Sequence, residues 1–97
     1  MGLFGFGKKE QMVKVSDFFS VEDLETIRGT AQAARSRGAV VDLLGKGLIE
    51  YISNPDKEIP YSKFNKFIKI ANSFREMEPS LDAILKQGID KYKAAGK

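Results

Sequence analysis

Carboxylates, lysines and tyrosines are the side chains that could carry catalysis in this chain, because the sequence has no Cys, His or Trp. Without Cys and His there is no zinc site of the usual kind, no haem or iron–sulfur ligation and no thiol or Ser–His nucleophile. Asp82 and Asp90 lie eight residues apart, near one face of a helix, and Glu76 and Glu78 flank a turn. Carboxylates are typical of water-facing helix surfaces, so we interpret these four as surface charges. We therefore expect no catalytic or metal-binding residue, no cofactor and no enzymatic activity.

Lysines at a spacing of three residues could instead contact nucleic acid. Lys63, Lys66 and Lys69 follow one flank of an amphipathic segment, and Arg35 adds a cation elsewhere. Lysines arranged in this way can neutralise phosphates. The chain as a whole is only mildly basic, with 16 Lys and Arg against 13 Asp and Glu and a net charge of +3. Basic side chains also cover the water-facing side of ordinary helices, so nucleic-acid binding is kept as an alternative.

The first nine residues combine bulky apolar and basic side chains. Leu3, Phe4 and Phe6 precede Lys8 and Lys9. Apolar residues beside lysines suit docking into a groove of a partner protein or insertion at a membrane surface. We predict that this segment is a docking arm for a protein partner, with the membrane surface as the alternative.

Residues 20–54 carry the strongest helical signal. Ser20 is a good N-cap, and the acidic residues after it lie where the helix dipole favours negative charge. Apolar and small residues then recur at alternating spacings of three and four. This repeat consists of Leu24, Ile27, Ala31, Ala34, Gly38, Val41, Gly45, Leu48 and Ile52. Because the repeat keeps its phase across Gly38, we favour, by a narrow margin, one long helix bent there over two helices.

Two prolines and several turn-forming residues predict a reversal at residues 53–60. Ser62 is a candidate N-cap for the helix that follows. Pro79 interrupts that helix, since the residue before a proline is pushed away from the helical conformation. A last helix then runs to residues 94–96. The expected helix-packing stripe of the whole chain consists of Leu24, Ile27, Val41, Leu48, Phe64, Phe67 and Phe74.

These patterns predict an all-α fold, either an antiparallel helical hairpin or a small three- to four-helix bundle with a short extended N-terminal arm. Residues 1–15 are expected to form a flexible or extended arm, and residues 16–97 the helical domain. No apolar run approaches the roughly 18–20 residues of a membrane span. We therefore expect a cytoplasmic protein, with a peripheral position at a membrane as the alternative.

The expected function is that of a small non-enzymatic helical interaction or assembly protein, which associates with itself and docks partly through its apolar arm. Its partners would be further copies of itself or another protein, and no small-molecule substrate is expected. One alternative is a nucleic-acid-binding regulator that uses the Lys-lined helix. The other is a peripheral membrane-associated protein.

Overall fold

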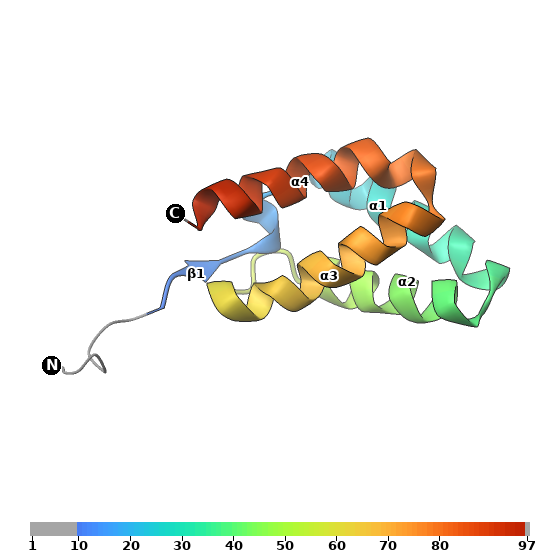
Figure 1. The fold of residues 1–97 in the computed structure, drawn as a ribbon, viewed down its shortest axis with the longest axis horizontal. Coiled ribbons are helices and arrows are strands. Elements are labelled where there is room, and N and C mark those ends of the chain that lie inside the picture. Colours follow the sequence, from blue (N-terminus) through green and yellow to red (C-terminus); the bar gives the residue numbers. More distant parts are fainter. Residues whose placement is uncertain (1–9, 97) are drawn as a thin grey trace, which may run out of the picture.

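The chain forms a small all-α fold of four helices in the computed structural model, which describes residues 10–96 (Figure 1). Each helix packs against the next one along the chain, so the predicted small helical bundle is confirmed. The helices are α1 (Val21–Ala34), α2 (Ala39–Ile52), α3 (Tyr61–Met77) and α4 (Asp82–Ala95). The shorter elements are the 3-10 turns η2 (Val15–Asp17), η3 (Arg35–Arg37) and η4 (Pro79–Leu81) and the strands β1 (Met12–Val13) and β2 (Ile59–Pro60).

Helix α1 begins where the sequence predicted. The Ser20 hydroxyl oxygen accepts a hydrogen bond from the backbone amide of Asp23 at 3.1 Å, which satisfies a free donor of the first turn. Glu22 and Asp23 place negative charge at the positive end of the helix dipole. Phe19 and Leu24, on either side of this cap, are both buried and anchor the start of the helix in the core.

The chain reverses between α1 and α2, which corrects the prediction of one long helix. Helix α1 ends at Ala34, and after η3 the residue Gly38 has φ 154° and ψ 164°. A side chain at this φ is strained, so glycine permits the reversal. A Cβ at Gly45 would lie 3.2 Å from the Ala31 carbonyl oxygen, so the two helices cross closely. The apolar repeat faces the core in both α1 and α2, so its regular spacing gave no indication that the helix ends before Gly38.

The reversal at residues 53–60 is confirmed, since α2 ends at Ile52 and α3 begins at Tyr61. Ser62 is not the N-cap, because α3 begins one residue earlier, with Pro60 at the cap position. Here β2 pairs with β1 in antiparallel register, with Met12 opposite Pro60. The segment before α1 is thus hydrogen-bonded to the start of α3.

Pro79 ends α3 as predicted, and α4 runs to Ala95. Two tyrosines join the far ends of these helices. The rings of Tyr61 and Tyr92 stack with their centroids 4.3 Å apart, and each hydroxyl donates a hydrogen bond of 2.9 Å to the backbone carbonyl of the other residue. Burial of the Tyr92 hydroxyl, together with its neighbour Tyr61, raises the pKa of Tyr92.

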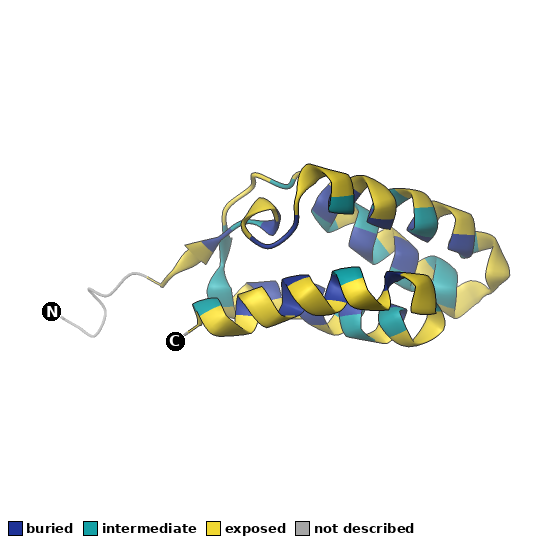
Figure 2. Cartoon of the chain, turned by 90° about the horizontal axis from the view of Figure 1, so that it is seen from above, coloured by how far each residue is buried: buried dark blue, intermediate teal, exposed yellow. Residues whose placement is uncertain are grey.

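One hydrophobic core runs along the length of the bundle, and Figure 2 shows its buried positions on the inward sides of the helices. Val13 and Val15 are also buried in it, so the chain from β1 onwards packs with the helices. Of the helix-packing stripe, Leu24, Ile27, Leu48, Phe64, Phe67 and Phe74 are buried and Val41 is half-buried.

Gly88 is a sensitive point of the core, because a Cβ there would overlap the ring of Phe19. We expect Gly88→Ala to destabilise the protein by about 1–3 kcal/mol through overpacking. Gly29→Ala is the matched control, since a Cβ at Gly29 meets nothing within 4 Å. It should stabilise α1 by about 0.4–1 kcal/mol. Urea unfolding followed by circular dichroism measures both changes, and equal stability of the two variants would contradict the Phe19–Gly88 packing.

Candidate functional site

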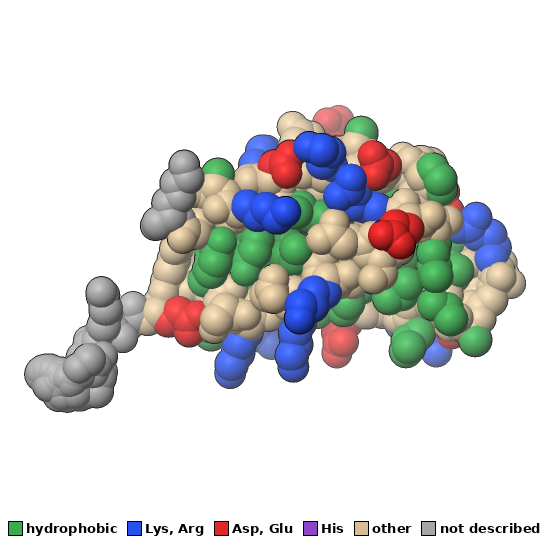
Figure 3. All heavy atoms as spheres, viewed as in Figure 1, with side chains coloured by type: hydrophobic (Ala, Val, Ile, Leu, Met, Phe, Trp, Pro, Cys, Tyr) green, Lys and Arg blue, Asp and Glu red, His purple; other side chains and the backbone are tan. Residues whose placement is uncertain are grey.

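Exposed apolar side chains gather on two neighbouring helices. Val40 and Leu43, at the start of α2, are 58% and 70% exposed, and Met77, at the end of α3, is 38% exposed. Gly47 of α2 faces Ile70 of α3, so in these antiparallel helices Val40 lies opposite Met77. Figure 3 shows apolar side chains gathered at this end of the molecule. We call Val40, Leu43 and Met77 the α2–α3 patch.

The patch lies outside the apolar repeat that the sequence analysis identified. Gly45, Leu48 and Ile52 of α2 are buried, whereas Leu43 belongs to the opposite side of the helix. One feature of the sequence could have indicated this patch. The segment of α2 has consecutive apolar pairs at residues 40–41 and 43–44, which is more apolar residues than a single buried helix face needs. An amphipathic helix with a second apolar side commonly marks a contact surface.

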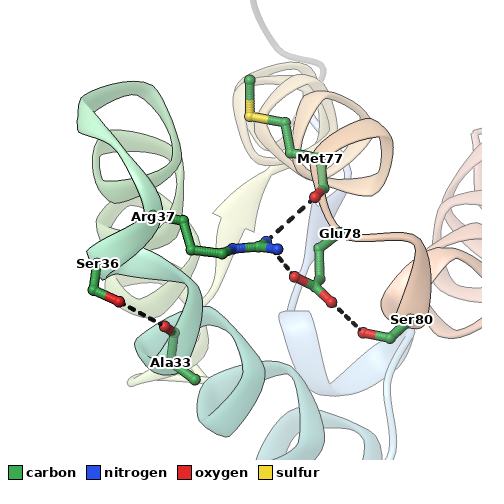
Figure 4. A network of polar contacts seen from close by, with 6 residues as sticks. All are labelled: Ala33, Ser36, Arg37, Met77, Glu78 and Ser80. Atoms are coloured by element: carbon green, nitrogen blue, oxygen red, sulfur yellow. Dashed lines mark hydrogen bonds and ion pairs between the residues drawn. The ribbon is translucent and has the colours of Figure 1, made fainter.

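A polar network holds the chain at this end of the bundle (Figure 4). The Arg37 guanidinium, from η3, forms an ion pair with Glu78 and donates a hydrogen bond of 3.3 Å to the Met77 carbonyl. Glu78 in turn accepts a hydrogen bond of 2.5 Å from the Ser80 hydroxyl. The Met77 side chain extends away from this network (Figure 4). The α1–α2 reversal and the α3–α4 turn are thereby connected beside the patch.

The charges next to the patch on α2 are already paired. Arg35 Nε lies 2.7 Å from Asp42 Oδ1, and Lys46 Nζ lies 3.3 Å from Asp42 Oδ2. The hydrogen bond from Arg35, with support from Lys46, lowers the pKa of Asp42 below its ordinary value. Arg35 is therefore engaged within the chain, and it lies near the start of α2.

Lys63 and Lys66 lie at the other end of α2, where they line a hollow of about 680 Å³ with Lys57. Glu50 and Glu58 line the same hollow, so its charge is mixed. Lys69 is exposed further along α3. The fold brings the three lysines Lys63, Lys66 and Lys69 onto one exposed side of α3, and Arg35 does not join them. Residues 59–75 contain no Asp or Glu, so the acidic side chains near these lysines come from other segments of the chain.

The predicted docking arm, Leu3, Phe4, Phe6, Lys8 and Lys9, lies outside the described residues. The two residues that follow this segment, Glu10 and Gln11, are hydrogen-bonded to the start of α3. The backbone amide of Ser62 donates a hydrogen bond of 2.7 Å to Glu10 Oε2, and that of Tyr61 donates one of 2.8 Å to the Gln11 carbonyl. A carboxylate from fifty-two residues earlier thus satisfies a free donor of α3.

Hydrogen bonding from Ser62, through its side chain and its amide, lowers the pKa of Glu10, and the charge of Lys63 acts in the same direction. A depressed pKa means that the ionised carboxylate stabilises the fold above the unfolded-state pKa of about 4.3, and that this stabilisation is lost as the pH falls through the lower folded-state value.

We therefore expect Glu10→Gln to be less stable than the parent protein at pH 7, with a difference that shrinks towards pH 3. Urea unfolding at the two pH values measures this change. Glu25→Gln, the same substitution at an exposed position of α1 away from the start of α3, is the control. If Glu10→Gln lowers the free energy of unfolding by the same amount at both pH values, the charge of the Glu10 carboxylate is not what stabilises α3.

Within residues 10–96, no group of three or more acidic side chains could hold a metal ion. None of the helices there is both long and apolar enough to cross a lipid bilayer.

Comparison of the chain with protein-family models, with curated proteins and with solved structures found no match to any of them.

Proposed function

We propose that this protein is a small helical interaction module that associates with itself through the α2–α3 patch. The observation that carries the proposal is the exposure of Leu43, 70% of whose surface faces water beside Val40 and Met77. Fully burying a side chain of this size contributes about 1.5–3 kcal/mol relative to leaving it exposed. In a symmetric dimer the same patch is used by both copies, so each contact occurs twice.

The docking role of Leu3, Phe4 and Phe6 is a separate proposal, for which deletion of residues 1–9 is the test.

We expect Leu43→Glu to abolish or strongly weaken self-association, because the new charge would have to be buried in the interface. Sedimentation equilibrium across micromolar concentrations measures the association. Val21→Glu is the matched control, since Val21 is 73% exposed and lies at the start of α1, away from the patch.

The results expected for the two variants distinguish association through the α2–α3 patch from association elsewhere. Self-association that survives in the Val21→Glu variant and is lost in the Leu43→Glu variant supports the proposal. A parent protein that stays monomeric at all concentrations tested, or a Leu43→Glu variant that associates like the parent, would overturn it. Urea unfolding of both variants shows whether either change acts on the fold instead.

Nucleic-acid binding is the second candidate function, and the row of three exposed lysines on α3 is the observation that favours it. Lys63, Lys66 and Lys69 form no ion pair within the described part of the chain. Such free lysines can release counterions from a phosphate backbone. The mixed charge of the hollow that Lys63 and Lys66 line makes this candidate weaker than self-association.

For this candidate we expect binding to duplex DNA that weakens steeply with salt and weakens further in Lys66→Glu. Fluorescence anisotropy over a salt series measures it. Lys86→Glu, on α4, gives the same change of charge away from α3 and serves as the control. Binding that is absent at low salt, or equal loss in both variants, would exclude the Lys-lined helix as the contact.

A further inference from the structure

We propose that the hollow between the end of α2 and the start of α3 binds a small phosphorylated molecule, the phosphate monoester of a sugar or of a nucleoside. Its volume of about 680 Å³ lies within the range of about 300–1,000 Å³ that is usual for small-molecule sites. The proposal is independent of self-association, because Val40 and Leu43 of the α2–α3 patch lie at the opposite end of α2.

Two aromatic rings fix how the helices meet at the hollow. Tyr51 of α2 packs on Phe67 of α3 with the ring centroids 5.1 Å apart. Glu50 precedes Tyr51 and Lys66 precedes Phe67, so these two charged residues come from neighbouring positions of the two helices. Both line the hollow, and they form no ion pair with each other. Opposite charges therefore face the same space from two helices without neutralising each other.

Three lysines line the hollow. Lys63 and Lys66 are one turn apart on α3, and Lys57 comes from the loop before this helix. All three are exposed, and none forms an ion pair with a residue in 10–96. A phosphate monoester carries a charge of about −1.5 to −2 and three strong acceptor oxygens. Such a group compensates three ammonium groups better than a carboxylate does, since a carboxylate has a single charge.

The hollow also contains acceptors, which a bare phosphate ion cannot use. Glu50 lies on α2, and Glu58 lies in the loop. Neither carboxylate forms an ion pair within the part of the chain that the structure describes. A long row of phosphates would be repelled by these carboxylates. Sugar hydroxyls, by contrast, donate hydrogen bonds to carboxylates, so a sugar attached to one phosphate suits both kinds of lining residue.

The rest of the lining includes apolar side chains. Tyr51, Ile59 and Pro60 are half-buried and line the hollow beside the charged residues. Pockets for small molecules commonly combine apolar and aromatic side chains with a few polar groups. A nucleobase could pack on these side chains, so the apolar lining distinguishes a nucleotide from a simple sugar phosphate.

Hydrogen bonds hold the loop that borders the hollow. The Lys57 amide donates a hydrogen bond of 3.1 Å to the Asn54 carbonyl, and the Ser16 amide donates one of 2.9 Å to the Pro55 carbonyl. Ile59 and Pro60 of β2 are paired with β1. The hollow is therefore formed without a ligand, which reduces the entropy cost of binding.

Amide NMR spectra during titration test the proposal. The probes are adenosine monophosphate, ribose phosphate (the same molecule without its base), adenosine and inorganic phosphate. We expect the two phosphorylated sugars to bind at least about tenfold more tightly than adenosine or inorganic phosphate, because only they use both the lysines and the carboxylates. The shift changes should lie within residues 50–66. Tighter binding of adenosine monophosphate than of ribose phosphate would identify a nucleotide, and equal binding a sugar phosphate.

Matched variants locate the contact. Lys66→Gln should weaken binding of the tighter phosphorylated probe by about three- to tenfold, and Glu50→Gln by about threefold. Lys69→Gln makes the same change one turn further along α3, at an exposed residue that does not line the hollow, and should leave the dissociation constant unchanged. Glu25→Gln, on α1, is the control for Glu50→Gln. Urea unfolding of the variants shows that the fold is retained.

Three results would overturn the proposal. The first is inorganic phosphate that binds as tightly as the phosphorylated sugars, which would indicate an unspecific anion contact. The second is an equal loss of affinity in Lys66→Gln and Lys69→Gln. The third is the absence of shift changes within residues 50–66 at millimolar probe concentrations. None of these results bears on self-association, which Leu43→Glu tests separately.

Discussion

The reversal of the chain at Gly38 is the constraint on which the rest of the structure depends. Helices of 14 residues are marginal on their own in water, so α1 and α2 need each other's apolar faces. The backbone of Gly38, at φ 154°, turns α2 back along α1, and the small residues Ala31 and Gly45 let the two helices approach closely. The large rings of α3 and α4 then complete the core of this hairpin. The same reversal places the start of α2, with Val40 and Leu43, at one end of the molecule.

The elements that depend on local chemistry were predictable from the sequence. The Ser20 cap, the proline-rich reversal at residues 53–60 and the break at Pro79 all follow from the properties of one or two residues. The inward positions of the helices followed from spacing alone. What spacing did not decide was whether the helix continues through Gly38, because a hairpin and a long helix use the same inward positions.

Contacts between segments that are far apart in the sequence could not be predicted from local sequence patterns. The start of α3 lacks a side-chain cap of its own, and Glu10, fifty-two residues earlier, supplies the acceptor. No pattern near Ser62 indicates such a partner. The α2–α3 patch was missed for a related reason, since Leu43 counts as apolar in any sequence pattern and becomes unusual only when the fold leaves it facing water. The fold also separates the basic residues of the nucleic-acid candidate. It pairs Arg35 with Asp42, whereas the lysines of α3 form no ion pair with any residue in 10–96.

The sheet of β1 and β2 has a consequence for the order in which the protein assembles. The four helices contact their neighbours along the chain, and contacts of this local kind form rapidly. Met12, by contrast, pairs with Pro60 across forty-eight residues, and closing so long a loop costs entropy before the contact is gained. We therefore expect the helical hairpins to form first in folding and the segment that begins at Glu10 to join them last, when Val13 and Val15 become buried against the helices.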